Sequence, residues 1–127
     1  MESYRTPLSR ARGLGAAKHG VTHWIAERVS ALALVPLCAW LIWAGLVLAG
    51  ADYDTAVAFV AQPLNAVLLT LLIAVGFWHM HAGMRVIVED YIGGAQRAAL
   101  LILNLFISVL AGALAIFCIL KVALGGA

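Results

Sequence analysis

The chain has 127 residues, of which 65% are hydrophobic and only 11% charged. Average soluble domains are about 45–50% apolar and about 25% charged. A water-soluble globular domain is therefore excluded, because so apolar a surface would associate in water. Disorder is excluded as well, since it requires low hydrophobicity and high charge. A chain of this length forms at most one domain, and its composition is typical of a protein embedded in a lipid bilayer.

Residues 1–20 form a basic tail that we expect to be irregular and cytoplasmic. Three long apolar segments follow, and they predict helices at about 24–49, 63–90 and 96–122. Each segment is long enough, since roughly 20 apolar residues cross a hydrocarbon core of about 30 Å. Backbone groups inside lipid must hydrogen-bond within their own segment, which favours helices. The predicted fold is an all-α integral membrane protein, with three transmembrane helices in a single membrane-anchor domain over residues 1–127.

Local features mark the ends of these segments. Asp54–Thr55 predicts a cap for a short apolar segment that ends near Ala61. Pro63 suits the first turn of the second long helix, where its missing N–H costs nothing. Gly93–Gly94 predicts the break between the second and third long helices. Pro36 lies inside the first long helix, which membrane helices tolerate. That helix exceeds the roughly 7–15 apolar residues of a signal-peptide core, so we expect it to be retained.

The distribution of lysine and arginine predicts the orientation. Five basic residues lie in the first 28 positions, namely Arg5, Arg10, Arg12, Lys18 and Arg28. The loop 50–62 contains none, whereas the loop 89–97 contains Arg97, and Lys121 lies near the C-terminus. Because cytoplasmic loops are enriched in lysine and arginine, we expect the N-terminus in the cytoplasm and the C-terminus outside. The early Glu2 argues against an organellar transit peptide, so we expect a multi-pass protein of the bacterial inner (cytoplasmic) membrane.

The second apolar segment carries ionisable residues, which suggest function when they lie inside a membrane. His79 precedes Asp90 by 11 residues, or about 16 Å along a helix, which puts it near the bilayer midplane. Its partner is either a metal, with haem iron as the candidate, or a hydrogen bond across the bundle, which is the commoner case for a lone membrane histidine. Gly83 lies one turn further on nearly the same face, where a missing side chain would leave clearance for a haem. Close helix packing is the other explanation for this glycine.

His81 lies about 160° around the helix from His79, so the two histidines cannot flank one iron. We expect the second axial ligand to come from another polypeptide. His81 shares a face with Arg85, and two interpretations stay open: contact with a haem propionate or partner subunit, or a backbone hydrogen bond for His81 while Arg85 extends to the headgroups. We expect Asn104 and Ser108 to hydrogen-bond between helices. Other side chains should only pack, namely Trp40, Trp43, Cys38 and Cys118.

The chain lacks a dinucleotide-binding glycine fingerprint, a cysteine cluster and a soluble domain, so we do not expect an enzyme by itself. The run His79-x-x-x-Gly83, followed by Asp90-Tyr91, resembles helix two of the hydrophobic membrane anchor subunit of succinate dehydrogenase (respiratory complex II). A second match is Gly20-Val21-Thr22-His23-Trp24, followed by Arg28, Ser30, Ala31 and Leu32. The resemblance extends from about Gly20 to the C-terminus.

The resemblance implies that His79 is an axial ligand of haem b, the other ligand coming from the larger anchor subunit. It implies that Tyr91 hydrogen-bonds a ubiquinone carbonyl and that Asp90 shapes this site or its proton supply. Arg28 matches an arginine near the haem propionates, although a positive-inside charge explains it equally well. The role of His23 is left open. The implied partners are the larger anchor subunit, an iron–sulfur subunit, a flavoprotein subunit and the bilayer, with no nucleic acid.

Three other interpretations remain. A fumarate reductase anchor would use the same fold and ligands in the reverse direction. A structural or assembly protein without haem would use its polar side chains only to bind neighbouring helices. A small transporter would use His79, Arg85 and Asp90 as a proton path, but such proteins are often built from inverted repeats and none is apparent in this sequence.

Overall fold

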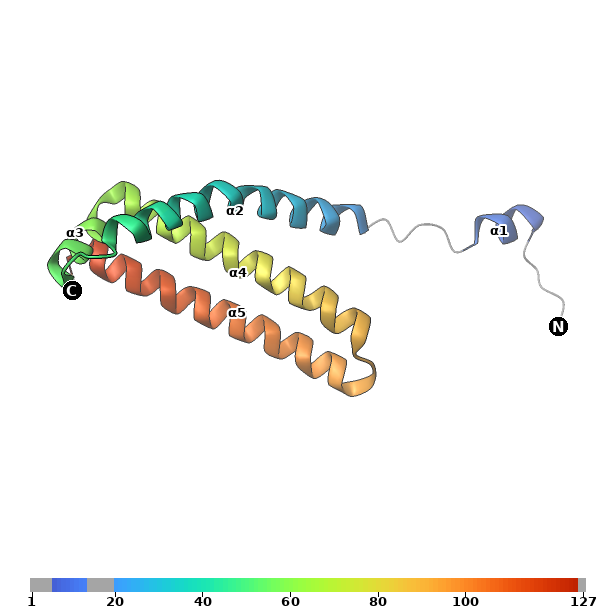
Figure 1. The fold of residues 1–127 in the computed structure, drawn as a ribbon. Coiled ribbons are helices and arrows are strands. Elements are labelled where there is room, and N and C mark those ends of the chain that lie inside the picture. The colour runs from blue at the N-terminus through green and yellow to red at the C-terminus, as the bar shows by residue number, and fades with distance from the viewer. Residues whose placement is uncertain (1–5, 14–19, 126–127) are drawn as a thin grey trace.

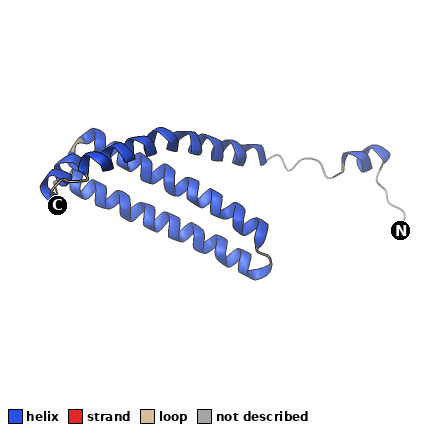
Figure 2. Ribbon diagram, viewed as in Figure 1, coloured by secondary structure: helices blue, strands red, loops and turns tan. Residues whose placement is uncertain are grey.

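The computed structural model describes residues 6–13 and 20–125. In chain order the helices are α1 (Pro7–Arg12), α2 (Gly20–Leu48), α3 (Tyr53–Ala61), α4 (Pro63–Tyr91) and α5 (Gly94–Ala123). The described residues contain no strand (Figure 2). Three helices, α2, α4 and α5, are long and apolar enough to cross a membrane. The predicted all-α fold with three membrane-spanning helices is therefore confirmed.

The three long helices lie side by side, with α4 in contact with both α2 and α5 (Figure 1). The short helix α3 contacts α4 and α5 at the end of the bundle where α2 ends. Figure 1 shows the start of α2, the end of α4 and the start of α5 together at the opposite end. Polar residues near Arg85 and His23 therefore belong to the same end of the bundle, although they lie far apart in the sequence.

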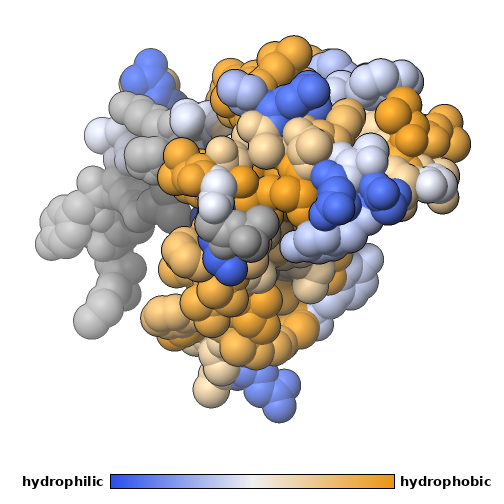
Figure 3. Space-filling model, turned by 90° about the vertical axis from the view of Figure 1, so that its left-hand side faces the viewer, coloured by the Kyte–Doolittle hydropathy of each residue, from blue (hydrophilic) through white to orange (hydrophobic). Residues whose placement is uncertain are grey.

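Most of the side chains buried between the helices are small or polar. Among the described residues, the buried ones are Ser30, Ala44, Asn65, Ala66, Ala82, Val88, Ser108 and Gly112. A β-carbon on Gly112 would lie 3.4 Å from the Phe77 ring, so the glycine permits close approach of α4 and α5. Such residues are typical of membrane helix packing, because lipid gives helices no hydrophobic reason to associate. Many large apolar side chains are instead exposed on the outside of the helices. The view from the α3 end shows orange apolar residues over much of that end, with blue polar residues among them (Figure 3).

Local sequence explains where the helices begin and end. Pro63 occupies the first turn of α4, as predicted. Gly94, with φ +66°, takes the left-handed conformation at the turn into α5, so the predicted break is also confirmed. The cap of α3 differs from the prediction: Asp52 is the N-cap and accepts a 2.9 Å hydrogen bond from the Thr55 N–H. The capping oxygen thus comes from the residue just before the helix, not from Asp54–Thr55.

Two further expectations were wrong. Part of the tail is helical, because Thr6 caps α1 by accepting a hydrogen bond from Ser9 and Pro7 occupies its first turn. The rest of the tail, including Arg5 and Lys18, lies outside the described residues. Cys38 and Cys118 are free and exposed on the apolar surface, not packed between helices. A free cysteine behaves as a small apolar side chain, so its exposure on an apolar surface is compatible with lipid.

Candidate functional site

His79 lies in the second half of α4, half-buried against α2. Its Nδ1 is 3.0 Å from the hydroxyl oxygen of Ser30, which is itself buried at 7% exposure. The Ser30 hydroxyl also donates a 2.9 Å hydrogen bond to the carbonyl of Glu27, one turn earlier in α2. The contact between His79 and Ser30 joins two helices through the histidine that the sequence analysis singled out.

The neighbouring positions on this face of α4 are open. A β-carbon added to Gly83 would meet no other atom within 4 Å, so helix packing inside this chain does not explain the glycine. Asp90 and Tyr91 at the end of α4 are exposed, and Tyr91 is 85% exposed. Gly83 therefore leaves space one turn from His79, and the polar end of α4 is exposed.

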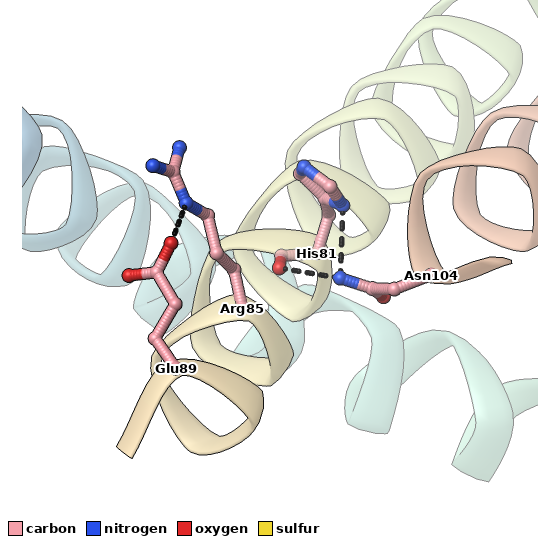
Figure 4. A network of polar contacts seen from close by, with 4 residues as sticks. All are labelled: His81, Arg85, Glu89 and Asn104. Carbon is pink, nitrogen blue, oxygen red and sulfur yellow. Dashed lines mark hydrogen bonds and ion pairs between the residues drawn. The ribbon is translucent and has the colours of Figure 1, made fainter. Parts of the chain in front are cut away.

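His81 points elsewhere, towards α5 (Figure 4). The side-chain amide nitrogen of Asn104 lies 3.0 Å from Nδ1 of His81 and 3.0 Å from the carbonyl oxygen of His81. Because the carbonyl only accepts, this amide atom is the donor NH₂, and Nδ1 of His81 must be an acceptor. A neutral His81 then carries its hydrogen on Nε2.

Arg85 forms an ion pair with Glu89 one turn further along α4, at 2.8 Å (Figure 4). Its side chain is 49% exposed, so this contact contributes little to stability. Both residues that the sequence analysis left between a partner contact and a role within the chain therefore have contacts inside this chain. Nδ1 of His81 is engaged within the bundle, and Arg85 has an acidic partner in its own helix.

A cavity of about 460 Å³ lies between α2, α4 and α5. Its polar lining residues include His23, Glu27, His81 and Arg85, and its walls are largely apolar. His81 and Arg85 therefore share a face, as the spacing predicted, and that face looks into the cavity. His79 is not among the lining residues, so the two histidines serve different surroundings.

The remaining predicted side chains have simpler positions. Arg28 is exposed, with its guanidinium 5.5 Å from the centre of the Trp24 ring, a cation–π contact. Asn104 bonds across to α4 as expected, whereas Ser108 donates within α5 to the Asn104 carbonyl at 2.7 Å. Trp40 and Trp43 pack against Phe59 of α3, with ring centres 6.4 Å apart in both pairs.

Sequence reasoning gave no role to two buried side chains that make tertiary contacts. In the sequence, Ser30 is only one residue of the matching motif, and Asn65 carries no prediction. The Asn65 amide donates a 2.8 Å hydrogen bond to the Phe59 carbonyl at the end of α3, tying α3 to the start of α4. A polar residue in an apolar helix was the available indication in both cases.

Among the described residues, no group of three or more His, Cys, Asp or Glu side chains could hold a metal ion. A single axial histidine requires no such group.

The fold and its polar helix define a multi-pass membrane protein with a half-buried histidine inside one of its membrane-spanning helices. Residues 2–120 match the family described as succinate dehydrogenase/fumarate reductase transmembrane subunit. The chain therefore belongs to this family, and it is a membrane anchor subunit of the succinate dehydrogenase type.

Several curated relatives support this membership. The succinate dehydrogenase hydrophobic membrane anchor subunit of Paracoccus denitrificans is 30% identical over 122 residues, covering 96% of this chain and 95% of the relative. The subunit of the same name from Rickettsia conorii is 29% identical over 119 residues, covering 90% and 94%. That of Rickettsia bellii is 30% identical over 89 residues, covering 70% and 71%. No solved structure is significantly similar to this chain.

Proposed function

We propose that this chain contributes one axial ligand of haem b and part of a ubiquinone-reduction site to a succinate:quinone oxidoreductase. In this proposal it is not catalytic by itself, and it docks the iron–sulfur and flavoprotein subunits at the membrane. The names of its relatives favour succinate oxidation over the fumarate reductase alternative. The observation that carries the proposal is the hydrogen bonding of His79.

The surroundings of His79 suit a haem ligand. Its Nδ1 is engaged by Ser30, while Nε2 has no contact of its own among the hydrogen bonds of the described residues. Gly83 leaves space one turn further on the same face. Iron ligation uses an unprotonated imidazole nitrogen, so the available Nε2 is the atom we assign to the iron. When bound, the haem would supply one-electron transfer chemistry in the membrane.

The second axial ligand must come from another chain in this proposal. His81 is the other histidine of α4, and its Nδ1 is already engaged by Asn104 on the α5 side. His23 lies near the start of α2, at the end of the bundle where α4 finishes. His19 lies outside the described residues. We therefore propose a second membrane anchor subunit as the partner that covers the His79 face.

Tyr91 and Asp90 are the proposed quinone-site residues. The Tyr91 hydroxyl can donate to a carbonyl oxygen, and its 85% exposure leaves it free to do so at the end of α4. Exposed Asp90 beside it can take up and pass on a proton. The exposed guanidinium of Arg28 lies on α2 two residues before Ser30, which is compatible with the proposed contact to a haem propionate.

The proposed orientation follows the lysine and arginine distribution. With the N-terminus in the cytoplasm, the end of α4 carrying Asp90 and Tyr91 also faces the cytoplasm. Flavoprotein and iron–sulfur subunits would dock on this side of the bacterial inner membrane. Protons for quinone reduction would then enter from the cytoplasm.

Spectra of the purified complex test the haem assignment. Reduced-minus-oxidised difference spectra should show a b-type haem in the parent complex. The His79→Ala variant should lose or alter that spectrum, and His81→Ala, a matched control on the same helix, should keep it. The opposite pattern would refute the assignment of His79. A parent complex without haem would favour the structural or assembly interpretation.

The kinetics of ubiquinone reduction test the proposed role of Tyr91 in the quinone site. Tyr91→Phe removes only the hydroxyl, so ubiquinone reduction should weaken. Succinate oxidation with an artificial electron acceptor should survive, because it bypasses the quinone. Unchanged ubiquinone kinetics in this variant would leave Tyr91 as an interfacial aromatic anchor only.

A further inference from the structure

Ser30 has more hydrogen-bonding contacts than its own burial requires. A buried hydroxyl needs a partner, and the Glu27 carbonyl at 2.9 Å already provides one. Serine side chains in helices commonly bond back to the preceding turn in this way. The additional contact, 3.0 Å to Nδ1 of His79, is thus not needed to satisfy Ser30. Its consequence is for the histidine.

Counting hydrogens determines which ring nitrogen of His79 carries one. A serine hydroxyl has one hydrogen and two lone pairs. When that hydrogen goes to the Glu27 carbonyl, Nδ1 of His79 must carry a hydrogen and donate it to the Ser30 oxygen. When the hydrogen goes to Nδ1 instead, the contact between the Ser30 and Glu27 oxygens has no hydrogen between them. Only the first arrangement makes both contacts hydrogen bonds, and in it a neutral His79 has no hydrogen on Nε2.

We infer that Ser30 is a positioning residue for His79: it holds the imidazole in the Nδ1–H tautomer and so keeps the Nε2 lone pair available for the haem iron. This inference rests on the proposed function of His79 and extends it to a residue of α2. Metal-binding histidines usually donate their second ring N–H to an acceptor, which fixes the ring and makes it a stronger ligand. The Ser30 oxygen is that acceptor here.

The inference has an electronic consequence. Donation from Nδ1–H to the Ser30 oxygen makes the imidazole a better electron donor, which favours oxidised iron and lowers the haem midpoint potential. Loss of the hydroxyl leaves Nδ1–H without its acceptor and allows the ring to take the other tautomer. Partners of this kind are worth about 10- to 100-fold in metal affinity. Both effects depend on the oxygen atom, not on the volume of the side chain.

The test compares variants at position 30 in the complete purified complex. Ser30→Thr keeps a hydroxyl. Ser30→Val introduces a side chain of nearly the same shape as threonine but without the hydroxyl. Ser30→Ala removes the serine hydroxyl and adds nothing. Ser108→Ala is the matched control, because Ser108 is also buried and donates to a main-chain carbonyl of its own helix. The measurements are the haem midpoint potential at one fixed pH and the fraction of haem retained during prolonged detergent washing.

We expect Ser30→Ala and Ser30→Val to shift the midpoint potential to a more positive value and to retain haem less well. Ser30→Thr and Ser108→Ala should match the parent in both measurements. The inference is overturned if Ala and Val leave potential and retention unchanged, or if Thr loses haem as they do, since size would then be responsible. Haem loss in Ala and Val with retention in Thr supports it. A parent complex without haem, or His79→Ala with its haem intact, instead refutes the proposed function.

Discussion

Asn104 offers a quantitative test of how α4 and α5 are held together. Its side-chain amide donates to the His81 ring at 3.0 Å and to the His81 carbonyl at 3.0 Å. Measured hydrogen bonds between membrane helices average about 0.6 kcal/mol, with a maximum of about 1.7 kcal/mol. Two such contacts predict that Asn104→Ala lowers the free energy of unfolding by about 1–3 kcal/mol.

A double-mutant cycle with His81→Ala separates the two contacts. The cycle reports only the bond between the side chains, because the His81 carbonyl remains in the alanine variant. We expect a coupling energy of about 0.6 kcal/mol and no more than about 1.7 kcal/mol, smaller than the full effect of Asn104→Ala. The difference between these two values measures the main-chain contact.

The assay is titration of the full-length chain with SDS in mild detergent, followed by the fluorescence of its four tryptophans. Ile107→Ala is a suitable control, since this apolar α5 side chain is 53% exposed and cannot hydrogen-bond. A coupling energy of zero, together with a neutral Asn104→Ala, would refute the reasoning. The α4–α5 pair would then depend on packing alone.

Two further predictions concern packing and capping. A β-carbon at position 112 would already lie 3.4 Å from Phe77, and Gly112→Val adds two further methyl groups. SDS titration should therefore show that the free energy of unfolding falls by about 1–3 kcal/mol. Gly76→Val is the control, because a β-carbon on Gly76 meets no atom within 4 Å and its free energy of unfolding should not change in this way. Hydrogen bonds from the side chain and then the main-chain N–H of Thr55 lower the pKa of Asp52 from its usual value of 3.8. The ionised Asp52 carboxylate caps α3, and its pKa is lower in the folded protein than in the unfolded chain. The capping contribution to the protection of α3 from hydrogen exchange is therefore complete above pH 3.8, and it is lost as the pH falls through the lower pKa of the folded form. Asp52→Ala should remove this pH dependence, and a dependence that persists would show that another group causes it.

Hydropathy, together with the proline and glycine residues at the helix ends, predicted the long helices because both signals are local in the sequence. A run of apolar residues must be helical in lipid, and Pro63 marks the start of α4. The start of α2 was placed at about residue 24, but the helix begins at Gly20, because polar residues such as Thr22 and His23 can extend a helix beyond its apolar core. Helix ends in an interfacial region are not fixed by hydropathy.

Side-chain partners were harder to predict because they depend on the neighbouring helix. The helical period correctly separated the faces of His79 and His81. It contained no information on which α2 residue stands opposite His79, so Ser30 received no role. Asn104 was expected to bond between helices, since an amide in lipid needs a partner, but its choice of His81 required the register of α5 on α4.

The two histidines of α4 differ most in how the chain uses their Nδ1 atoms. Nδ1 of His81 accepts from Asn104, which leaves the hydrogen on Nε2 and makes that nitrogen a donor. Nδ1 of His79 stands against a hydroxyl whose hydrogen is directed to Glu27, which leaves Nε2 as an acceptor. A nitrogen that carries a hydrogen cannot bind iron. Of these two histidines, His79 therefore suits the proposed ligand role better, through hydrogen bonds to α2 and α5, two helices that lie on different sides of α4.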